Sequence, residues 1–132
     1  MVDSTSLLDW DNNPTTTAER FIGRIITAAS FADNELRLSF DNGLTVRIYD
    51  GGQSCCEHRY METADNATDL VGQKLSAIDV KKVESGHDDD GYSFHEIAFL
   101  EVRAGHVIVA FSTHNEHNGY YGGFDLSLSE VG

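Results

Sequence analysis

The spacing of apolar residues constrains the fold of this chain more than any other feature of the sequence. In the two runs 36–40 and 44–48, leucine, phenylalanine, valine and isoleucine occupy every second position, with polar residues between them. A period of two places the apolar side chains on one face of a β-strand, whereas a helix needs a period of 3.6. Asn42-Gly43 separates the runs, and this pair predicts a β-hairpin whose two turn residues have positive φ.

The remainder of the chain follows the same pattern. Further strands are predicted at 97–102, 107–111 and 124–128, and no apolar stripe of helical period extends beyond two turns. Short helices are predicted only for 16–21 and for part of 57–70. The sequence therefore predicts an all-β fold with one or two short helices.

An internal repeat divides the chain into two similar units. The octet at 21–28, Phe-Ile-Gly-Arg-Ile-Ile-Thr-Ala, matches the octet at 70–77, Leu-Val-Gly-Gln-Lys-Leu-Ser-Ala. A predicted hairpin follows each octet. The offset between the copies grows from 49 residues (21 to 70) to 62 (43 to 105), so the second copy has 13 extra residues before its hairpin. Two such three-stranded antiparallel meanders are expected to cover each other's apolar faces as a sandwich or partly open barrel with a pseudo-twofold axis.

These elements set the expected boundaries. A chain of 132 residues is predicted to form one domain. We expect a flexible N-terminal arm at 1–17 and a β domain at 18–132, with copies at about 18–57 and 67–121 and a closing strand at 123–130. The predicted core residues are Ile26, Leu38, Phe40, Val46, Ile48, Leu75, Phe99, Val107, Val109 and Phe111.

The net charge of −13, from 22 acidic and 9 basic residues, excludes several classes of partner. Binding to a nucleic-acid backbone or to an anionic membrane surface needs clustered Lys and Arg. No apolar run approaches the ~20 residues of a membrane span, and the polar, acidic residues 1–11 do not resemble a secretory signal. We therefore expect a cytoplasmic protein in which Cys55 and Cys56 remain reduced.

Two loops carry the residues most typical of a binding site. Each loop follows the third strand of its copy, so packing of the copies face to face is expected to bring both loops to one end of the domain. Glycines in these loops allow close backbone approach to a ligand, and tyrosines provide ring faces and hydroxyl groups. The predicted ligand-binding residues are Gln53, Cys55, Cys56 and Glu57 in the first loop, and His114, Asn115, Glu116, His117, Asn118, Tyr120 and Tyr121 in the second.

Three motifs give the chain a resemblance to a known family. They are Gln53-x-Cys55-Cys56-Glu57, Asp69-Leu70-Val71-Gly72 and Asn118-Gly119-Tyr120-Tyr121. Together they resemble a family of short proteins from phage and bacterial genomes that carry a domain of unknown function, over roughly Leu44 to Leu128. The resemblance implies a small, soluble, phage-encoded protein of the host cytoplasm, and it implies no established activity.

The same residues allow chemical interpretations besides simple binding. His114 and His117 are candidate ligands of a divalent metal, but no complete metal motif is present, and hydrogen bonds to loop carbonyls explain them as well. Cys55 is a candidate nucleophile with either histidine as its base, provided that a helix beginning near Glu57 lowers the thiol pKa. The run Asp88-Asp89-Asp90-Gly91 lacks the spacing of a calcium loop and predicts a solvated acidic loop.

The incomplete catalytic sets favour a binding protein over an enzyme. We expect the two loops to bind a small nucleotide-like ligand or a host protein, without a cofactor; oligomerisation is open. Two alternatives remain. One is a metal- or cysteine-dependent hydrolase that uses His114, His117 and Cys55, and the other is an acidic decoy that mimics DNA.

Overall fold

Short strands account for most of the structure, a computed structural model that describes residues 4–7, 17–52, 57–82, 86–87, 94–117 and 124–131. The strands are β1 (Ser4–Ser6), β2 (Ile26–Ala32), β3 (Glu35–Phe40), β4 (Thr45–Asp50), β5 (Glu57–Glu62), β6 (Leu75–Lys82), β7 (Gly86–His87), β8 (Phe94–Ala104), β9 (Val107–His117) and β10 (Leu126–Val131). Two short 3-10 helices are η1 (Thr17–Phe21) and η2 (Ala67–Leu70).

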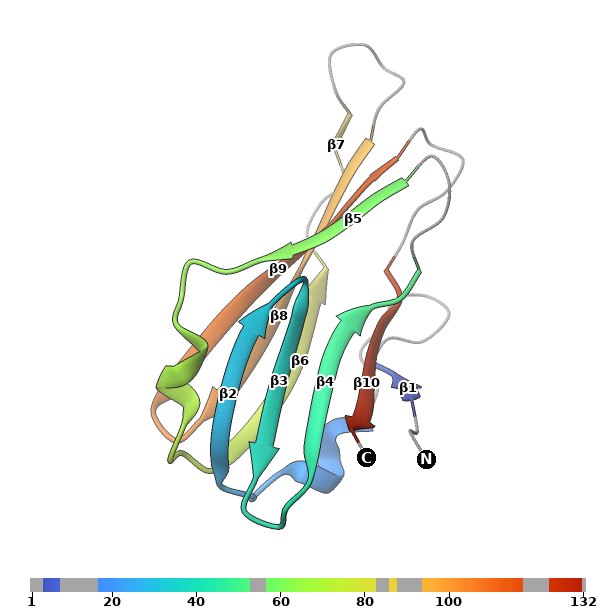
Figure 1. Cartoon of the computed structure of the whole chain (residues 1–132). Helices are drawn as coiled ribbons and strands as arrows, with labels where there is room; N and C mark the ends of the chain where they lie inside the picture. Colours follow the sequence, from blue (N-terminus) through green and yellow to red (C-terminus); the bar gives the residue numbers. More distant parts are fainter. Residues whose placement is uncertain are drawn as a thin grey trace.

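The strands form two antiparallel sheets that pack face to face as a β-sandwich (Figure 1). The first sheet has the order β1-β10-β4-β3-β2, and the second has the order β5-β9-β8-β6, with β7 paired to β8. The predicted all-β sandwich is confirmed. Part of the segment 57–70 was predicted to be helical, but its first six residues form β5 and only 67–70 form a helical turn.

The repeated octets meet each other around the pseudo-twofold axis. An isolated antiparallel bridge joins Ile25 to Lys74. Next to it, the Gly23 N–H donates to Leu75 O over 2.8 Å, and the equivalent Gly72 N–H donates to Ile26 O over 2.7 Å. Both glycines have positive φ, 89° and 86°, which explains why glycine occupies this position in both copies. The strand that begins within each octet also shifts register at the equivalent place, between Ile26 and Ala28 in β2 and between Leu75 and Ala77 in β6. The repeat is therefore a structural duplication.

Each copy places a fourth strand in the sheet of the other copy. Strand β4 leads into β5, which pairs with β9 in the second sheet, and β9 leads towards β10, which pairs with β4 in the first sheet. Strand β10 is the closing strand predicted at 123–130. Its counterpart β5 extends the first copy beyond the predicted end at residue 57, so both copies have four strands.

Part of the predicted N-terminal arm belongs to the first sheet. Strand β1 pairs with β10, and the Leu7 N–H donates to Leu126 O over 2.8 Å. Leu7 is buried. Strand β1 is therefore an edge strand, and the residue after it, Leu7, is its apolar anchor; residues 8–16 lie outside the described residues.

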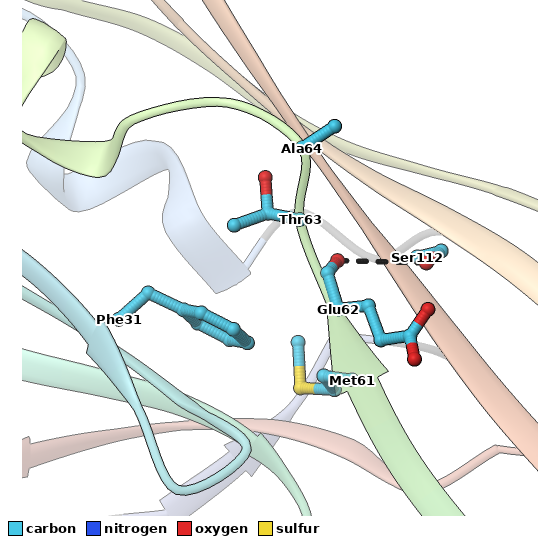
Figure 2. A pocket seen from close by; sticks show the side chains of 6 residues that line it. All are labelled: Phe31, Met61, Glu62, Thr63, Ala64 and Ser112. Carbon is cyan, nitrogen blue, oxygen red and sulfur yellow. Dashed lines mark hydrogen bonds between the residues drawn. The ribbon is translucent and has the colours of Figure 1, made fainter.

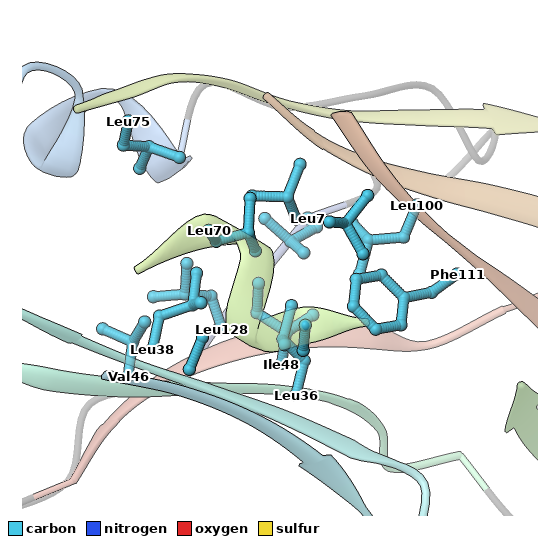
Figure 3. Close-up of a cluster of buried hydrophobic side chains, with 14 of the residues drawn as sticks. Leu7, Leu36, Leu38, Val46, Ile48, Leu70, Leu75, Leu100, Phe111 and Leu128 are labelled. Atoms are coloured by element: carbon cyan, nitrogen blue, oxygen red, sulfur yellow. The ribbon is translucent and has the colours of Figure 1, made fainter. Parts of the chain in front are cut away.

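The apolar core fills the space between the sheets, and its centre is shown in Figure 3. Eight of the ten predicted core residues are buried, and Val107 is partly buried against them. The prediction for Phe99 is wrong, because this side chain is 38% exposed on the outer face of β8. Its neighbours Ala98 and Leu100 are the inward residues. Apolar residues on both faces of this strand concealed the correct register.

The tight hairpin turn lies one connection earlier than predicted. Asp33 and Asn34 join β2 to β3 with φ of 54° and 62°, the pattern of a two-residue hairpin turn. Asn42-Gly43 does connect two strands, but within a four-residue link in which only Gly43 has positive φ. There the Asn42 side chain accepts a hydrogen bond from the Leu44 N–H over 3.1 Å.

Candidate functional site

One end of the second sheet extends beyond the first sheet (Figure 1). Strands β8 and β9 have 11 residues each, whereas their equivalents β3 and β4 have six. We call residues 57–60, 94–97 and 114–117 the extension. Four of the six histidines of the chain lie in it. The extra length of the second copy is divided between the connection from β6 to β8 and the longer β8 itself, and both lead into the extension.

The alternation of β9 divides the predicted site between two faces of the extension. Asn115 and His117 face inward, in line with Phe111 of the core, whereas His114 and Glu116 face outward. Glu57 lies opposite His117 in the register of β5 and β9, so it also faces inward. His114 and His117 point to opposite faces, and the structure therefore does not bring them together around one metal ion.

A buried network of charged groups occupies the inner face. Arg59 Nη1 donates to Asp50 over 3.0 and 3.1 Å, and Arg59 Nη2 donates to Glu57 Oε2 over 2.8 Å. The side chains of Arg59, Asp50 and Glu57 are only 9%, 4% and 1% exposed. Asp50 ends β4 in the first sheet, so Arg59 links the two sheets at this end of the sandwich.

Gly52 makes the close approach to Arg59 possible. A Cβ at this position would lie 2.7 Å from Arg59 Nη1 and 2.9 Å from the Asp125 side chain. The Gly52 N–H donates to Asp50 Oδ1 over 2.9 Å, and the Asp125 N–H donates to Asp50 Oδ2 over 3.2 Å. Asp50 therefore accepts hydrogen bonds from the chain just after β4 and just before β10.

The network continues along β8 and β9. Asn115 Nδ2 donates to Glu57 Oε2 over 2.9 Å, and His117 Nε2 donates to Glu96 Oε1 over 2.7 Å. Burial alone lowers the pKa of Arg59, but its hydrogen bond to Glu57 and the charges of Asp50 and Glu57 outweigh burial and raise that pKa above its ordinary value. The guanidinium is therefore permanently charged and holds two buried carboxylates.

Aromatic and imidazole rings cluster on the outer face. The rings of Tyr60 and His114 stack at 4.4 Å with an interplanar angle of 4°. A hydrogen bond of 2.8 Å joins His95 Nε2 to His114 Nδ1, and another of 2.8 Å joins His114 Nε2 to Ser112 Oγ. His58 stacks obliquely beside Tyr60, at 4.9 Å between ring centroids. The outer face of the extension is therefore a platform of four rings.

The platform disfavours charge on its central imidazole. Burial and the neighbouring His95 lower the pKa of His114 below its ordinary value, and the carboxylates of Glu62 and Glu116 offset this only in part. Burial and the same two carboxylates raise the pKa of Tyr60. At neutral pH both rings of the stack are uncharged. Within the described segments, no three His, Cys, Asp or Glu side chains converge to hold a metal ion.

A hollow of about 550 Å³ adjoins the platform (Figure 2). Phe31 of β2 and Met61 of β5 form its apolar wall, and Glu62, Thr63, Ala64 and Ser112 complete the lining. The Glu62 carboxylate lies 3.9 Å from His114 Nε2. The hollow therefore opens between edge strands of the two sheets, next to the ring cluster.

The remaining predicted site residues lie outside the described residues: Gln53, Cys55, Cys56, Asn118, Tyr120 and Tyr121, together with the acidic run at 88–91. The ends of both loops are described, and they are adjacent. Asp50, where the first loop begins, pairs with Leu126, where β10 begins. Glu57, where the first loop ends, pairs with His117, where the second begins. Glu57 starts a strand, so the helix required to activate Cys55 does not begin there.

Sequence reasoning missed several residues of this end. The predicted ligand-binding residues do not include His58, Tyr60, His95 and Glu96. Each lies on a strand whose pairing partner cannot be read from the sequence. The available signal was the excess length of the second copy combined with the concentration of histidines beside it. Nothing in the sequence indicates the ion pair between Asp50 and Arg59, since only the passage of the chain from β4 in one sheet to β5 in the other brings the two residues together.

These features define a class of small β-sandwiches: a duplicated four-stranded unit with exchanged fourth strands, and a charged network and ring platform at one end. The chain belongs to the family described as Domain of unknown function (DUF7448), which matches residues 19–126. Searches of the curated proteins and of the solved structures find no match. None of the described helices is long and apolar enough to cross a membrane.

Proposed function

We propose that this protein is a non-enzymatic binding protein that contacts a protein partner with the loop-bearing end of the sandwich. The observation that carries the proposal is the adjacency of the loop ends, since Asp50 pairs with Leu126 and Glu57 pairs with His117. Arg59 ties these ends together through a buried network. A rigid base of this kind supports two neighbouring loops as one contact surface.

The charges at this end favour a protein over a nucleotide. Among residues 57–60, 94–97 and 114–117, Arg59 is the only lysine or arginine, and its guanidinium binds Asp50 and Glu57. A nucleotide phosphate would meet the carboxylates of Glu62 and Glu116 on the outer face. A protein partner gains from the Tyr60–His114 stack, because aromatic rings contribute strongly to interfaces. A host protein bound by a phage-encoded factor fits this proposal.

The tyrosines of the second loop provide the test. Tagged wild-type protein, Tyr120→Ala and Tyr121→Ala are used to recover partners from host extract, and a recovered partner is then purified and titrated by calorimetry. Each alanine variant is expected to weaken binding by ~2 kcal/mol or more, about 30-fold in Kd, while the circular dichroism spectrum is unchanged. Ile108→Ala is the control, because this exposed side chain lies near the β8–β9 turn, at the opposite end of β9.

Two results would contradict this proposal. One is a purified partner that binds both tyrosine variants with wild-type affinity. The other is unfolding of both variants, which would place the tyrosines in the core rather than in a contact surface.

A second candidate function rests on the pairing of His117 with Glu96 at 2.7 Å, the arrangement of a base held by a carboxylate. His117 lies opposite Glu57, which follows Cys56 in the chain. This arrangement favours a cysteine-dependent hydrolase. Its test is the pH dependence of alkylation in Cys55→Ser and Cys56→Ser. A nucleophilic thiol reacts as a thiolate well below the ordinary thiol pKa of about 8.5, whereas ordinary behaviour of both thiols excludes the hydrolase.

A further inference from the structure

Two histidines direct ring nitrogens at each other on the outer face of the extension. His95 lies on β8 and His114 on the neighbouring strand β9, and His95 Nε2 is 2.8 Å from His114 Nδ1. Both side chains project from the same face, because His95 pairs with Glu116 and His114 lies two residues before Glu116. Imidazole is a preferred ligand of divalent zinc, copper and nickel ions.

The hydrogen bonds of Ser112 determine which nitrogen of His114 carries the proton. The Ser112 hydroxyl donates to the main-chain oxygen of Glu62 over 3.4 Å (Figure 2), so it accepts from His114 Nε2–H over 2.8 Å. The lone pair of His114 is therefore on Nδ1, the nitrogen that faces His95. A metal-bound histidine usually has such a partner at its other nitrogen, because that partner sets the tautomer and the orientation of the ring.

The His114 ring is held in place, whereas the His95 ring has room to adjust. Tyr60 stacks on His114 at 4.4 Å, and His114 is buried. His95 is half-buried, and within the part of the chain that the structure describes its ring is hydrogen-bonded to His114 alone. A tetrahedral zinc ion with Zn–N distances of about 2.0–2.1 Å separates two ligand nitrogens by about 3.3 Å, so a shift of the His95 ring by about 0.5 Å admits the ion.

Carboxylates near the histidine pair favour a cation. The Glu62 carboxylate lies 3.9 Å from His114 Nε2, and Glu116 lies directly opposite His95 on the same face. The net charge of −13 adds to this attraction. No third His, Cys, Asp or Glu side chain of the described segments converges with the pair, so water supplies the remaining ligands of a bound ion.

We propose that His95 and His114 bind one divalent transition-metal ion, with Zn²⁺ as the probe, through His95 Nε2 and His114 Nδ1. On binding, the proton of His95 is carried by Nδ1 instead of Nε2, so the neutral imidazole changes tautomer and no net proton is released. Two imidazole ligands select such an ion over Mg²⁺, which prefers oxygen ligands. The site is independent of the proposed binding function, because both ligands lie on strands rather than in the two loops.

The test titrates ZnCl₂ into the full-length protein after treatment with a chelator. Calorimetry is expected to show saturable binding of a single ion. NMR of the imidazole groups is expected to identify His95 Nε2 and His114 Nδ1 as the bound nitrogens. His95→Gln and His114→Gln should each weaken Zn²⁺ binding at least about tenfold, because even the loss of a group that only orients a metal ligand typically costs about 10–100-fold.

Two other histidines provide matched controls. His58 belongs to the same ring platform, but its side chain is 71% exposed and its Nδ1 lies 3.4 Å from Glu116 Oε2. His106 is exposed in the turn between β8 and β9, at the opposite end of these strands. His58→Gln and His106→Gln are expected to leave the Zn²⁺ affinity unchanged. Mg²⁺ is expected to leave the imidazole signals of His95 and His114 unchanged.

Three results would overturn the inference: no saturable Zn²⁺ binding to the wild-type protein, wild-type affinity in His95→Gln or His114→Gln, or an equal loss of affinity in His58→Gln. Circular dichroism checks that each variant is folded. If a variant unfolds, the imidazole signals of the wild-type protein decide alone, because binding through any other pair of nitrogens contradicts the proposed site.

Discussion

Replacement of Arg59 by methionine tests whether the buried network holds the loop-bearing end together. The substitution keeps a long apolar stem and removes three hydrogen bonds, two to Asp50 and one to Glu57. It leaves two carboxylates whose side chains are 4% and 1% exposed without their counter-charge. Removing one partner of a buried ion pair typically costs about 3–5 kcal/mol.

The structure places the expected loss at the lower end of that range. Asp50 keeps hydrogen bonds from the Gly52 and Asp125 N–H groups, and Glu57 keeps one from Asn115. We therefore expect a loss of about 3 kcal/mol at pH 7.5 and a fall in Tm of roughly 10 °C for a domain of this size. The loss should shrink towards pH 4, where the stranded carboxylates take up protons and become neutral.

Urea unfolding followed by circular dichroism at both pH values measures these changes. Arg37→Met is the control, because Arg37 also pairs with a carboxylate, Glu35, but its side chain is 50% exposed. Its expected cost is below about 1 kcal/mol. A cost of Arg59→Met that equals that of Arg37→Met, or that stays the same at low pH, would show that the network does not stabilise this end.

Three further predictions concern single positions. Gly23→Ala and Gly72→Ala should each lower stability by about 1 kcal/mol or more in urea unfolding, because both positions have positive φ; a loss at only one of them would contradict the pseudo-twofold equivalence. Between pH 7.5 and 5.5 the wild-type protein should lose stability, because the pKa of His114 is lower in the folded than in the unfolded chain, and the unfolded chain therefore binds the proton first once the pH falls below about 6.5. His114→Gln should lose less stability over this range. An equal loss would argue against burial and the His95 contact as causes of the lowered pKa. Phe99→Ser should change the free energy of unfolding by no more than about 0.5 kcal/mol, because this side chain lies on the outer face. A loss as large as that of a core substitution would contradict this placement.

The fold was predictable because its strongest signals are local. Alternation at 36–40 and 44–48 and the matching octets depend on neighbouring residues, and they specified the strands and the duplication correctly. Strand β5 was harder to predict, because its sequence Glu-His-Arg-Tyr-Met-Glu has few apolar residues. On its inner face, Arg59 binds the carboxylates of Glu57 and Asp50. Two of its three inward positions, Glu57 and Arg59, are charged and only Met61 is apolar, so the strand has no apolar alternation to detect.

The site was predictable only in part, because proximity in sequence is not proximity across a strand. His114 and His117 are three residues apart, yet they face opposite sides of β9, and each finds its partner on β8, in His95 and Glu96 respectively. Those pairings follow from the register of β8 and β9, which a single sequence does not specify. The adjacency of the two loops was anticipated from the repeat, and the described loop ends agree with it.

The exchange of fourth strands has a consequence for how such a chain arises and folds. The segment 17–62 alone contains β2, β3, β4 and β5, but β5 pairs only with a strand of the other copy. A single ancestral unit would therefore complete its sheets as a homodimer with swapped strands, and fusion of two genes would make that dimer permanent. In the present chain, β10 reaches back to β4 across the whole second copy. Folding must close this long loop, so we expect slow folding that finishes only after the last strand is synthesised.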